Sequence, residues 1–157
     1  MSDNYTRLAD TLGADEGKVY ATINGSNREL YEAQSIRAQI DLIVIERRIR
    51  GHKMTQHKVV GANGTGSCTR YFMNSDHLKK YMEYQKTGVF PPEKLQFINS
   101  DPQSTVGKQE VVLTNVIYGT IPVAALEESD DPITFDSNFT FDGIDGLDYF
   151  TAPANYR

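Results

Sequence analysis

The stretch from Arg48 to Met73 reads RIRGHKMTQHKVVGANGTGSCTRYFM. Its first part is basic and suited to β-structure, its middle is the glycine-rich segment GANGTG at 61–66, and its last part alternates in polarity. Glycine and asparagine tolerate positive φ angles, so this middle segment predicts a reversal of the chain. The alternation from Thr65 to Met73 predicts a returning strand. The whole stretch therefore indicates a long β-hairpin with an extended basic tip.

The preceding segment predicts the first strand of this hairpin. From Ile36 to Glu46 apolar side chains alternate with polar ones, which is typical of a strand with one buried face and one wet face. The polar face carries Arg37, Gln39 and Asp41. From Leu42 to Ile45 both faces are apolar, which predicts cover on both sides. A second sheet of the same chain or a neighbouring subunit would supply that cover equally well.

The rest of the sequence predicts short strands and one helix. A Ser75-Asp76 cap and the stop at Gly88 delimit a helix to about Thr87, whose apolar stripe is formed by Leu78, Tyr81 and Met82. Further strands are expected at Gly17–Ile23, about Arg28–Glu32 after an Asn24-Gly25 turn, Lys94–Asn99, Gln109–Tyr118, Gly119–Val123 and Ile133–Phe141. This pattern predicts a mainly β fold, a β-sandwich or barrel with one flanking α-helix.

Length and composition bound the class of protein. The 157 residues predict a single domain over 1–157, ending in a loose tail over 142–157 that is rich in glycine and aspartate. Cys68 is the one cysteine, so no disulfide forms within the chain. The N-terminal sequence has no apolar core of a signal peptide, and no apolar run is long enough to predict a membrane span.

Charge is unevenly distributed although the net charge is only −5. A basic stretch between Glu46 and Lys80 contains Arg47, Arg48, Arg50, Lys53, Lys58, Arg70, Lys79 and Lys80. An acidic stretch without any base contains Glu127, Glu128, Asp130, Asp131, Asp136, Asp142, Asp145 and Asp148. One interpretation is two unrelated solvated surfaces. The other is a polar subunit whose basic end meets the acidic end of the next copy.

No catalytic, metal or cofactor motif emerges from the residues. GANGTG matches neither dinucleotide nor P-loop spacing, and no G-x-S-x-G is present. The metal-ligand types His52, His57, Cys68 and His77 lack ligand spacing. We therefore predict no enzyme activity, no metal and no cofactor. The basic segment beside Tyr71 and Phe72 leaves a nucleic-acid-binding β-domain as the alternative, and a small-ligand barrel or enzyme as a further class.

Several of these motifs, in this order, resemble the tail tube proteins of contractile phage tails, specifically the PBSX-like family. That family also supplies the inner tube of headless R-type bacteriocins such as diffocins. Gly51, His52, Lys53 and the GANGTG segment match a G-x-x-x-T-G-x-K-x-x-GANGTG-type string, with extra residues between Lys53 and Gly61. The likeness continues through the predicted helix and the strands after Gln109.

The resemblance implies a structural protein with the tail-tube and type VI secretion tube fold. It implies six-membered rings that stack into a hollow tube inside a contractile sheath, a conduit for DNA or ions through a target cell envelope. The implied partners are further copies of the chain, the sheath protein, the baseplate or tube initiator, and a tape-measure protein or passing DNA in the lumen. The protein would be made in the bacterial cytoplasm and released on lysis as part of a phage tail or bacteriocin.

Within such a tube, two sets of residues receive roles. The lumen-lining set is Arg37, Gln39, Asp41, Thr65, Ser67 and Thr69, although sequence leaves open which parity of the second strand faces the lumen. The inter-ring set combines an extended tip over 47–64 with acids that the tip would meet in the next ring. Its members are Arg48, Arg50, Gly51, His52, Lys53, Lys58, Gly61, Asn63, Gly64, Glu127, Glu128, Asp130 and Asp131.

Overall fold

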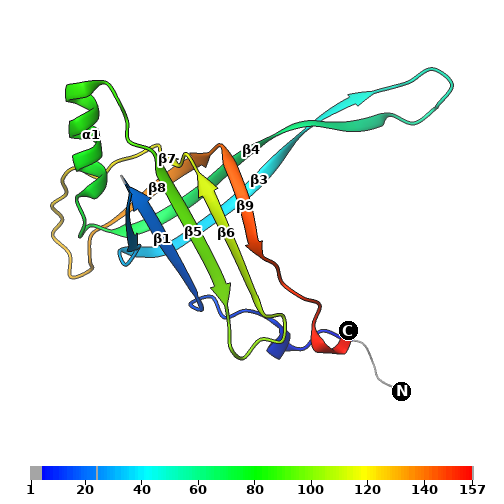
Figure 1. The fold of residues 1–157 in the computed structure, drawn as a ribbon, viewed down its shortest axis with the longest axis horizontal. Coiled ribbons are helices and arrows are strands. Elements are labelled where there is room, and N and C mark those ends of the chain that lie inside the picture. The colour runs from blue at the N-terminus through cyan, green and yellow to red at the C-terminus, as the bar shows by residue number, and fades with distance from the viewer. Residues whose placement is uncertain (1–4, 24, 157) are drawn as a thin grey trace. The chain divides into compact units, whose positions relative to one another are not determined.

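The computed structural model describes residues 5–23 and 25–156 of the chain. These residues form two compact units, each built on one antiparallel β-sheet (Figure 1). The first unit lies within residues 1–31, 89–116 and 143–157, and the second comprises 32–88 and 117–142. The mainly β fold with one α-helix that the sequence predicts is confirmed in the described part of the chain.

The first unit holds a five-stranded sheet in the order β2-β1-β5-β6-β9. Its strands are β1 Gly17–Ile23, β2 Ser26–Glu29, β5 Glu93–Ser100, β6 Lys108–Thr114 and β9 Gly143–Asp148. Gly25, with φ of 79°, lies in the turn between β1 and β2, whereas Asn24 falls outside the described residues. The return strand therefore begins earlier than the predicted 28–32.

The C-terminal part of the first unit corrects one expectation. The prediction of a loose tail over 142–157 is wrong for the first residues of that range, because β9 pairs with β6 from Gly143 to Asp148. After β9, the Thr151 amide donates a hydrogen bond to the Val106 carbonyl oxygen at 2.9 Å. Two short 3-10 helices, Leu8–Asp10 and Ala154–Tyr156, complete this unit. A sequence rich in glycine and aspartate favours a loop, but in residues 143–148 backbone pairing with β6 overrides that local preference.

The second unit holds a four-stranded sheet in the order β3-β4-β8-β7, and the α-helix. Its elements are β3 Ala33–Arg47, β4 Gln56–Tyr71, α1 Asp76–Thr87, β7 Ile117–Tyr118 and β8 Thr134–Phe141. β3 and β4 form the predicted long hairpin, and β8 pairs with β4 only from Gly64 to Tyr71. The strand expected over 119–123 is absent, since these residues open the loop that leads to β8.

The glycine-rich segment is not the turn of the hairpin, which corrects the prediction. GANGTG lies inside β4, and the chain reverses instead in the loop 48–55. There the His52 amide donates to the Ile49 carbonyl oxygen at 3.1 Å, and Gly51 has φ of 92°. This is the left-handed conformation that glycine supplies at the third position of a tight turn.

The glycines of β4 serve side-chain packing. A Cβ atom on Gly64 would meet the Phe141 ring, with Cδ2 at 2.6 Å. A Cβ atom on Gly66 would meet the Phe139 ring and lie 2.5 Å from the Arg37 carbonyl oxygen. The absent side chains let these two aromatic rings of β8 lie across β4 in the core of the unit. Glycine in a strand interior often marks such a close approach.

The limits of α1 are confirmed, but its predicted apolar stripe is not the buried side of the helix. Gly88 ends the helix with φ of 75°, its amide donating to the Tyr84 carbonyl oxygen at 2.8 Å. Tyr81 and Met82 are exposed by 43% and 46%, whereas His77 and Lys80 are buried. The helix turns its polar residues inward because His77 packs against a buried arginine and tyrosine of the sheet, described below.

Candidate assembly surfaces

One face of the second sheet gathers the predicted lumen-lining residues. In the register of β3 and β4, Arg37 lies opposite Ser67 and Gln39 opposite Thr65. Cross-strand partners point to the same side of a sheet, and residues two apart along a strand do so as well. All six predicted residues therefore share one face, because Thr65, Ser67 and Thr69 lie on the same side of the sheet as Arg37, Gln39 and Asp41. That this face lines a lumen stays a prediction.

Hydrogen bonds connect the side chains of this face. The Thr65 hydroxyl donates to a carboxylate oxygen of Asp41 at 3.2 Å, and the Gln39 amide donates to the same carboxylate at 3.3 Å. The Thr69 hydroxyl donates to Asp136 at 2.7 Å. The face thus consists of mutually bonded hydroxyl, amide and carboxylate groups on adjacent strands.

The polar face extends onto β8, which the sequence-based assignment omitted. Asn138 lies opposite Ser67 and Thr140 opposite Thr65, and a shallow hollow over the sheet is lined by residues of all three strands. The signal was present in the alternation of 133–141, whose outward residues are polar. Only the pairing of β8 with β4, however, places those residues beside the hairpin.

The opposite face carries the core of the unit and a buried cation. The Arg70 Nη1 atom donates to His77 Nδ1 at 2.9 Å, and its guanidinium carbon lies 4.8 Å from the centre of the Tyr118 ring. The rings of His77 and Tyr118 meet edge to face at 4.6 Å between centroids. Because arginine only donates, His77 accepts through Nδ1 and carries no proton there. This cluster fixes α1 against the sheet.

The cysteine is buried, and the three histidines occupy different environments. Burial raises the pKa of the Cys68 thiol to about 11, so the group stays protonated and unreactive at neutral pH. His52 and His57 are exposed on the hairpin, and His77 is buried in the cluster with Arg70. Among the described residues no three His, Cys, Asp or Glu side chains gather as a metal site requires.

The distal part of the hairpin forms a two-stranded ribbon, defined here as residues 42–47 and 56–62. The part of β4 that precedes Gly64, residues 56–63, pairs only with β3 within the described residues. A bulge leaves Val60 unopposed, because Gly61 pairs with Ile43 and Val59 with Val44. Apolar side chains on both faces of the ribbon are 38–59% exposed: Leu42, Ile43, Val44, Ile45, Val59 and Val60.

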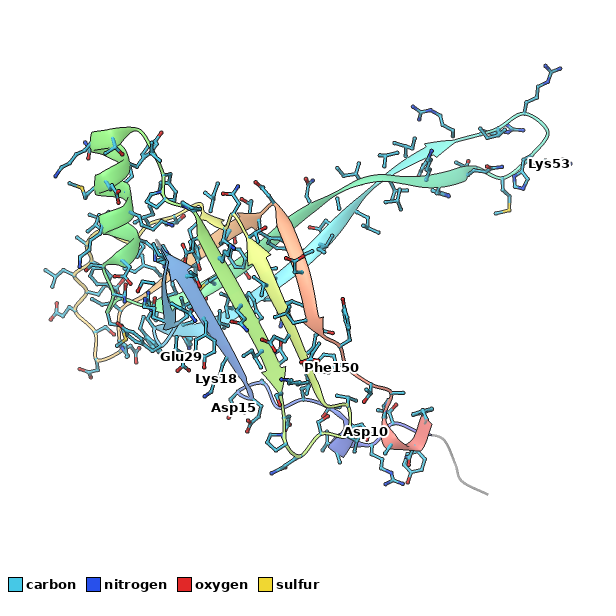
Figure 2. All side chains as sticks on the ribbon, viewed as in Figure 1. Asp10, Asp15, Lys18, Glu29, Lys53 and Phe150 are labelled. Carbon is cyan, nitrogen blue, oxygen red and sulfur yellow. The ribbon has the colours of Figure 1, made fainter. Side chains whose placement is uncertain are left out.

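The tip of the hairpin is basic and has a defined turn. Lys53 projects at the end of the hairpin (Figure 2), and the loop 48–55 also exposes Arg48 and Arg50. The His52 ring donates through Nδ1 to the Met54 carbonyl oxygen at 3.0 Å, which braces the turn. The tip is therefore the loop 48–55 rather than the predicted span 47–64.

Four residues of the predicted inter-ring set lie away from the tip. Lys58 is on the ribbon opposite Ile45, Gly61 lies under the Ile43 side chain, and Gly64 is under Phe141. Asn63 lies opposite Asp41, on the polar face of the sheet. These positions follow from the continuation of β4 through the glycine-rich segment.

The predicted acidic partners lie at the other end of the same sheet. Glu127, Glu128, Asp130 and Asp131 are exposed in the loop 119–133, defined here as the acidic loop. This loop returns to the sheet where the Phe72 amide donates to the Ile133 carbonyl oxygen at 2.9 Å, just beyond the C-terminal end of β4. The tip and the acidic loop lie at opposite ends of the β3–β4 hairpin (Figure 1). β4 spans 16 residues, and the rise per residue of a strand gives about 50 Å between its two ends.

Comparison with solved structures defines the class of fold. A chain in the structure of the anti-feeding prophage cap, an AFP tube terminating cap, matches with a TM-score of 0.65 at 9% identity, over 92% of this chain and 95% of that one. A chain in the PVC sheath/tube terminator of an extracellular contractile injection system matches with a TM-score of 0.62 at 9% identity, over 83% and 94%. The fold is therefore that of contractile injection system components.

Sequence comparison then gives the family. The chain belongs to the phage tail tube protein family, whose model matches residues 4–148. It is 29% identical over 139 residues to the phage-like element PBSX protein XkdM of Bacillus subtilis strain 168, covering 88% of this chain and 92% of that protein. The resemblance to PBSX-like tail tube proteins is confirmed, and the protein is a structural component of a phage tail tube. No helix among the described residues has the length and apolar character needed to cross a membrane.

Proposed function

We propose that this tail tube protein forms rings of six copies that stack head to tail into a hollow tube inside a contractile sheath. The tube would be a conduit for DNA or ions through a target cell envelope, and its role is structural, without enzyme activity. The observation that carries the proposal is the continuous polar face of β3, β4 and β8, bordered by a long strand with an open edge.

Ring closure follows from the edges of this sheet. β3 is an edge strand of 15 residues, and its outer side has no strand partner in the described part of the chain. An open edge of this length invites pairing with another strand, and the opposite edge, β7, has only two residues. Pairing between unlike edges of neighbouring copies is a heterologous contact, which forms a ring when the rotation between copies closes. A closed barrel then has no free edge.

The polar face would line the channel of that ring. It offers hydroxyl and amide groups, with Arg37 balanced by Asp41 and Asp136. Binding of nucleic acid to a protein depends mainly on clustered Lys and Arg side chains that neutralise phosphates. A wall with one cation and two carboxylates per copy therefore lets DNA or a tape-measure protein pass with little retention.

Stacking of rings would use the two ends of the sheet. The tip presents Arg48, Arg50 and Lys53, and the acidic loop presents four carboxylates at the opposite end. Charge complementarity across an interface steers association and fixes orientation more than it adds affinity. Each ring would therefore meet the next with its basic end against the acidic end. Charge reversal at Arg48 and Lys53, or high salt, would then weaken stacking.

The remaining partners follow from the particle that contains such a tube. We propose contacts with the sheath protein, with the baseplate or tube initiator, and with a tape-measure protein in the lumen. The protein would be made in the host bacterial cytoplasm and released on lysis. The match to a phage-like element protein supports either a DNA-injecting tail or a headless bacteriocin particle as its setting.

Negative-stain electron microscopy of the purified protein over a concentration series tests the proposal. Rings or hollow tubes of uniform width, growing in number with concentration, are the expected result. Only small monodisperse particles at every concentration would overturn self-assembly. Steeply salt-dependent binding of such particles to DNA would instead favour the nucleic-acid-binding alternative, because counterion release makes that binding sensitive to salt.

A further inference from the structure

The acidic loop carries exposed apolar side chains among its carboxylates. Leu126 is 98% exposed and Val123 is 64% exposed, and Glu127 follows Leu126 directly. Single exposed leucines are common on protein surfaces. Leu126 differs because it directly precedes a stretch with four acidic residues in a loop that contains no Lys or Arg. An exposed apolar side chain therefore lies beside a strongly negative surface.

The tip of the hairpin has the matching composition. Met54 is 74% exposed and Ile49 is 50% exposed, and they alternate with Arg48, Arg50 and Lys53 in the loop 48–55. Apolar side chains surrounded by charges are the usual anatomy of a protein interface, with an apolar centre and a polar rim. The charges of the tip have the sign opposite to those of the acidic loop.

The two surfaces cannot meet within one copy. The acidic loop is bound to the sheet at Ile133, about 50 Å from the tip by the rise of the strand. Leu126 lies seven residues before Ile133, and a fully extended chain of that length reaches only about 25 Å. The partner that fits both surfaces is therefore a second copy of this chain.

We propose that Leu126 of one copy inserts between Met54 and Ile49 of the next copy and is the apolar anchor of the stacking contact. This inference rests on the proposed tube and names the side chains that give its stacking contact affinity, whereas the charges give it direction. Removing a buried apolar anchor costs far more affinity than removing an exposed rim charge. Stacking should consequently depend more strongly on Leu126 than on any single carboxylate of the loop.

The first test compares Leu126→Ala with the matched control Leu8→Ala, whose side chain is 88% exposed in the other unit. Sedimentation measures the lowest protein concentration at which tubes persist. We expect Leu126→Ala to raise it by about tenfold or more, as loss of an interface anchor does, and Leu8→Ala to leave it unchanged. The thermal midpoint of the dispersed subunit should not change in either variant, because both side chains are solvated there.

The second test joins the two surfaces covalently. A chain with both Met54→Cys and Leu126→Cys is concentrated above its own assembly threshold and oxidised mildly, and the products are separated without reductant. A disulfide needs Cα atoms within about 7 Å, so the distant sites of one copy cannot form it, and each bond must link two copies. A ladder of multimers is expected. The control pair Met54→Cys and Leu8→Cys should give no ladder, and the buried Cys68 should not take part.

The outcomes separate this inference from the tube itself. Suppose that the wild-type protein forms tubes. Unaltered assembly of Leu126→Ala would then overturn the anchor and leave the tube intact. The absence of a ladder from tubes of the double-cysteine chain would do the same. Wild-type protein that forms neither rings nor tubes would overturn the proposed function and the anchor with it. A higher assembly threshold together with the ladder would support both.

Discussion

The two halves of the β3–β4 hairpin have the same pairing but opposite environments. In the half nearest α1, β8 pairs with β4, and its phenylalanines cover one face while the other face stays polar. In the distal ribbon, 42–47 and 56–62, both faces carry exposed apolar side chains. The difference between them is a third strand. The near half is therefore covered by strands of the same chain, whereas the apolar faces of the distal ribbon are exposed in one copy, and we expect a second copy to cover them.

The physical reason lies in what a hairpin alone can bury. A two-stranded ribbon in water is at best marginally stable, because it lacks a second layer to cover its apolar face. Apolar side chains such as Leu42 and Ile43 are therefore unfavourably exposed in one copy. Any surface that covers them would gain about 25 cal/mol per Å² of apolar area buried. The contrast gives four expected results.

Phe139→Ala should have the largest effect on the subunit. The Phe139 side chain is 1% exposed, and truncation of such a residue costs about 3–5 kcal/mol of the free energy of unfolding. Leu42→Ala, on the solvated ribbon, should change the same quantity by no more than about 0.5 kcal/mol. Urea denaturation of the dispersed subunit measures both variants. Equal losses would mean that the ribbon is already covered within one copy.

Gly66→Ala should destabilise by about 1–3 kcal/mol, because the added methyl group meets both the Phe139 ring and the Arg37 carbonyl oxygen. The matched change Gly61→Ala in the ribbon brings its Cβ only to 3.5 Å from Ile43 Cδ1, an ordinary contact, so stability should hardly change. Comparison of the two urea midpoints checks this. A neutral Gly66→Ala would contradict the packing role assigned to the glycines of β4.

Assembly should protect the tip from trypsin. Arg48, Arg50 and Lys53 lie in an exposed loop of the subunit, and cleavage of a ribbon that opens readily should be rapid. In tubes we expect cleavage at least about tenfold slower, since opening of the ribbon would then break contacts with a second copy. Mass spectrometry of timed digests identifies the sites. Equal cleavage rates in subunits and tubes would place the tip outside the stacking contact.

The last expected effect concerns pH. Burial raises the pKa of the Cys68 thiol to about 11 from its ordinary value near 9, so the unfolded state releases this proton first as pH rises. The contribution of Cys68 to stability is complete below pH 9 and is lost between about pH 9 and 11. Cys68→Ala should therefore lose less stability than wild type between pH 8 and pH 10.5. Parallel losses would show that the thiol ionises alike in both states.

Alternation let the sequence predict much of the second sheet. The polar and apolar residues of β3 and β8 lie on the expected faces, because period-two patterns map directly onto the pleat of a strand. The limits of α1 followed from Gly88, whose left-handed conformation stops a helix for local reasons. Its buried face did not follow, since the Arg70 and Tyr118 side chains that receive His77 come from distant strands.

Local periodicity and residue type were enough to predict most of the strands, the helix limits, the separation of charge and the resemblance to tail tube proteins. Long-range pairing was needed to show where the hairpin turns, which parity of β4 lies on the side of Arg37 and Gln39, and that the tip and the acidic loop lie at opposite ends of the hairpin. A glycine-rich segment is compatible both with a turn and with close packing. The pairing of β8 with β4 decides for close packing, because it places Phe139 over Gly66 and Phe141 over Gly64.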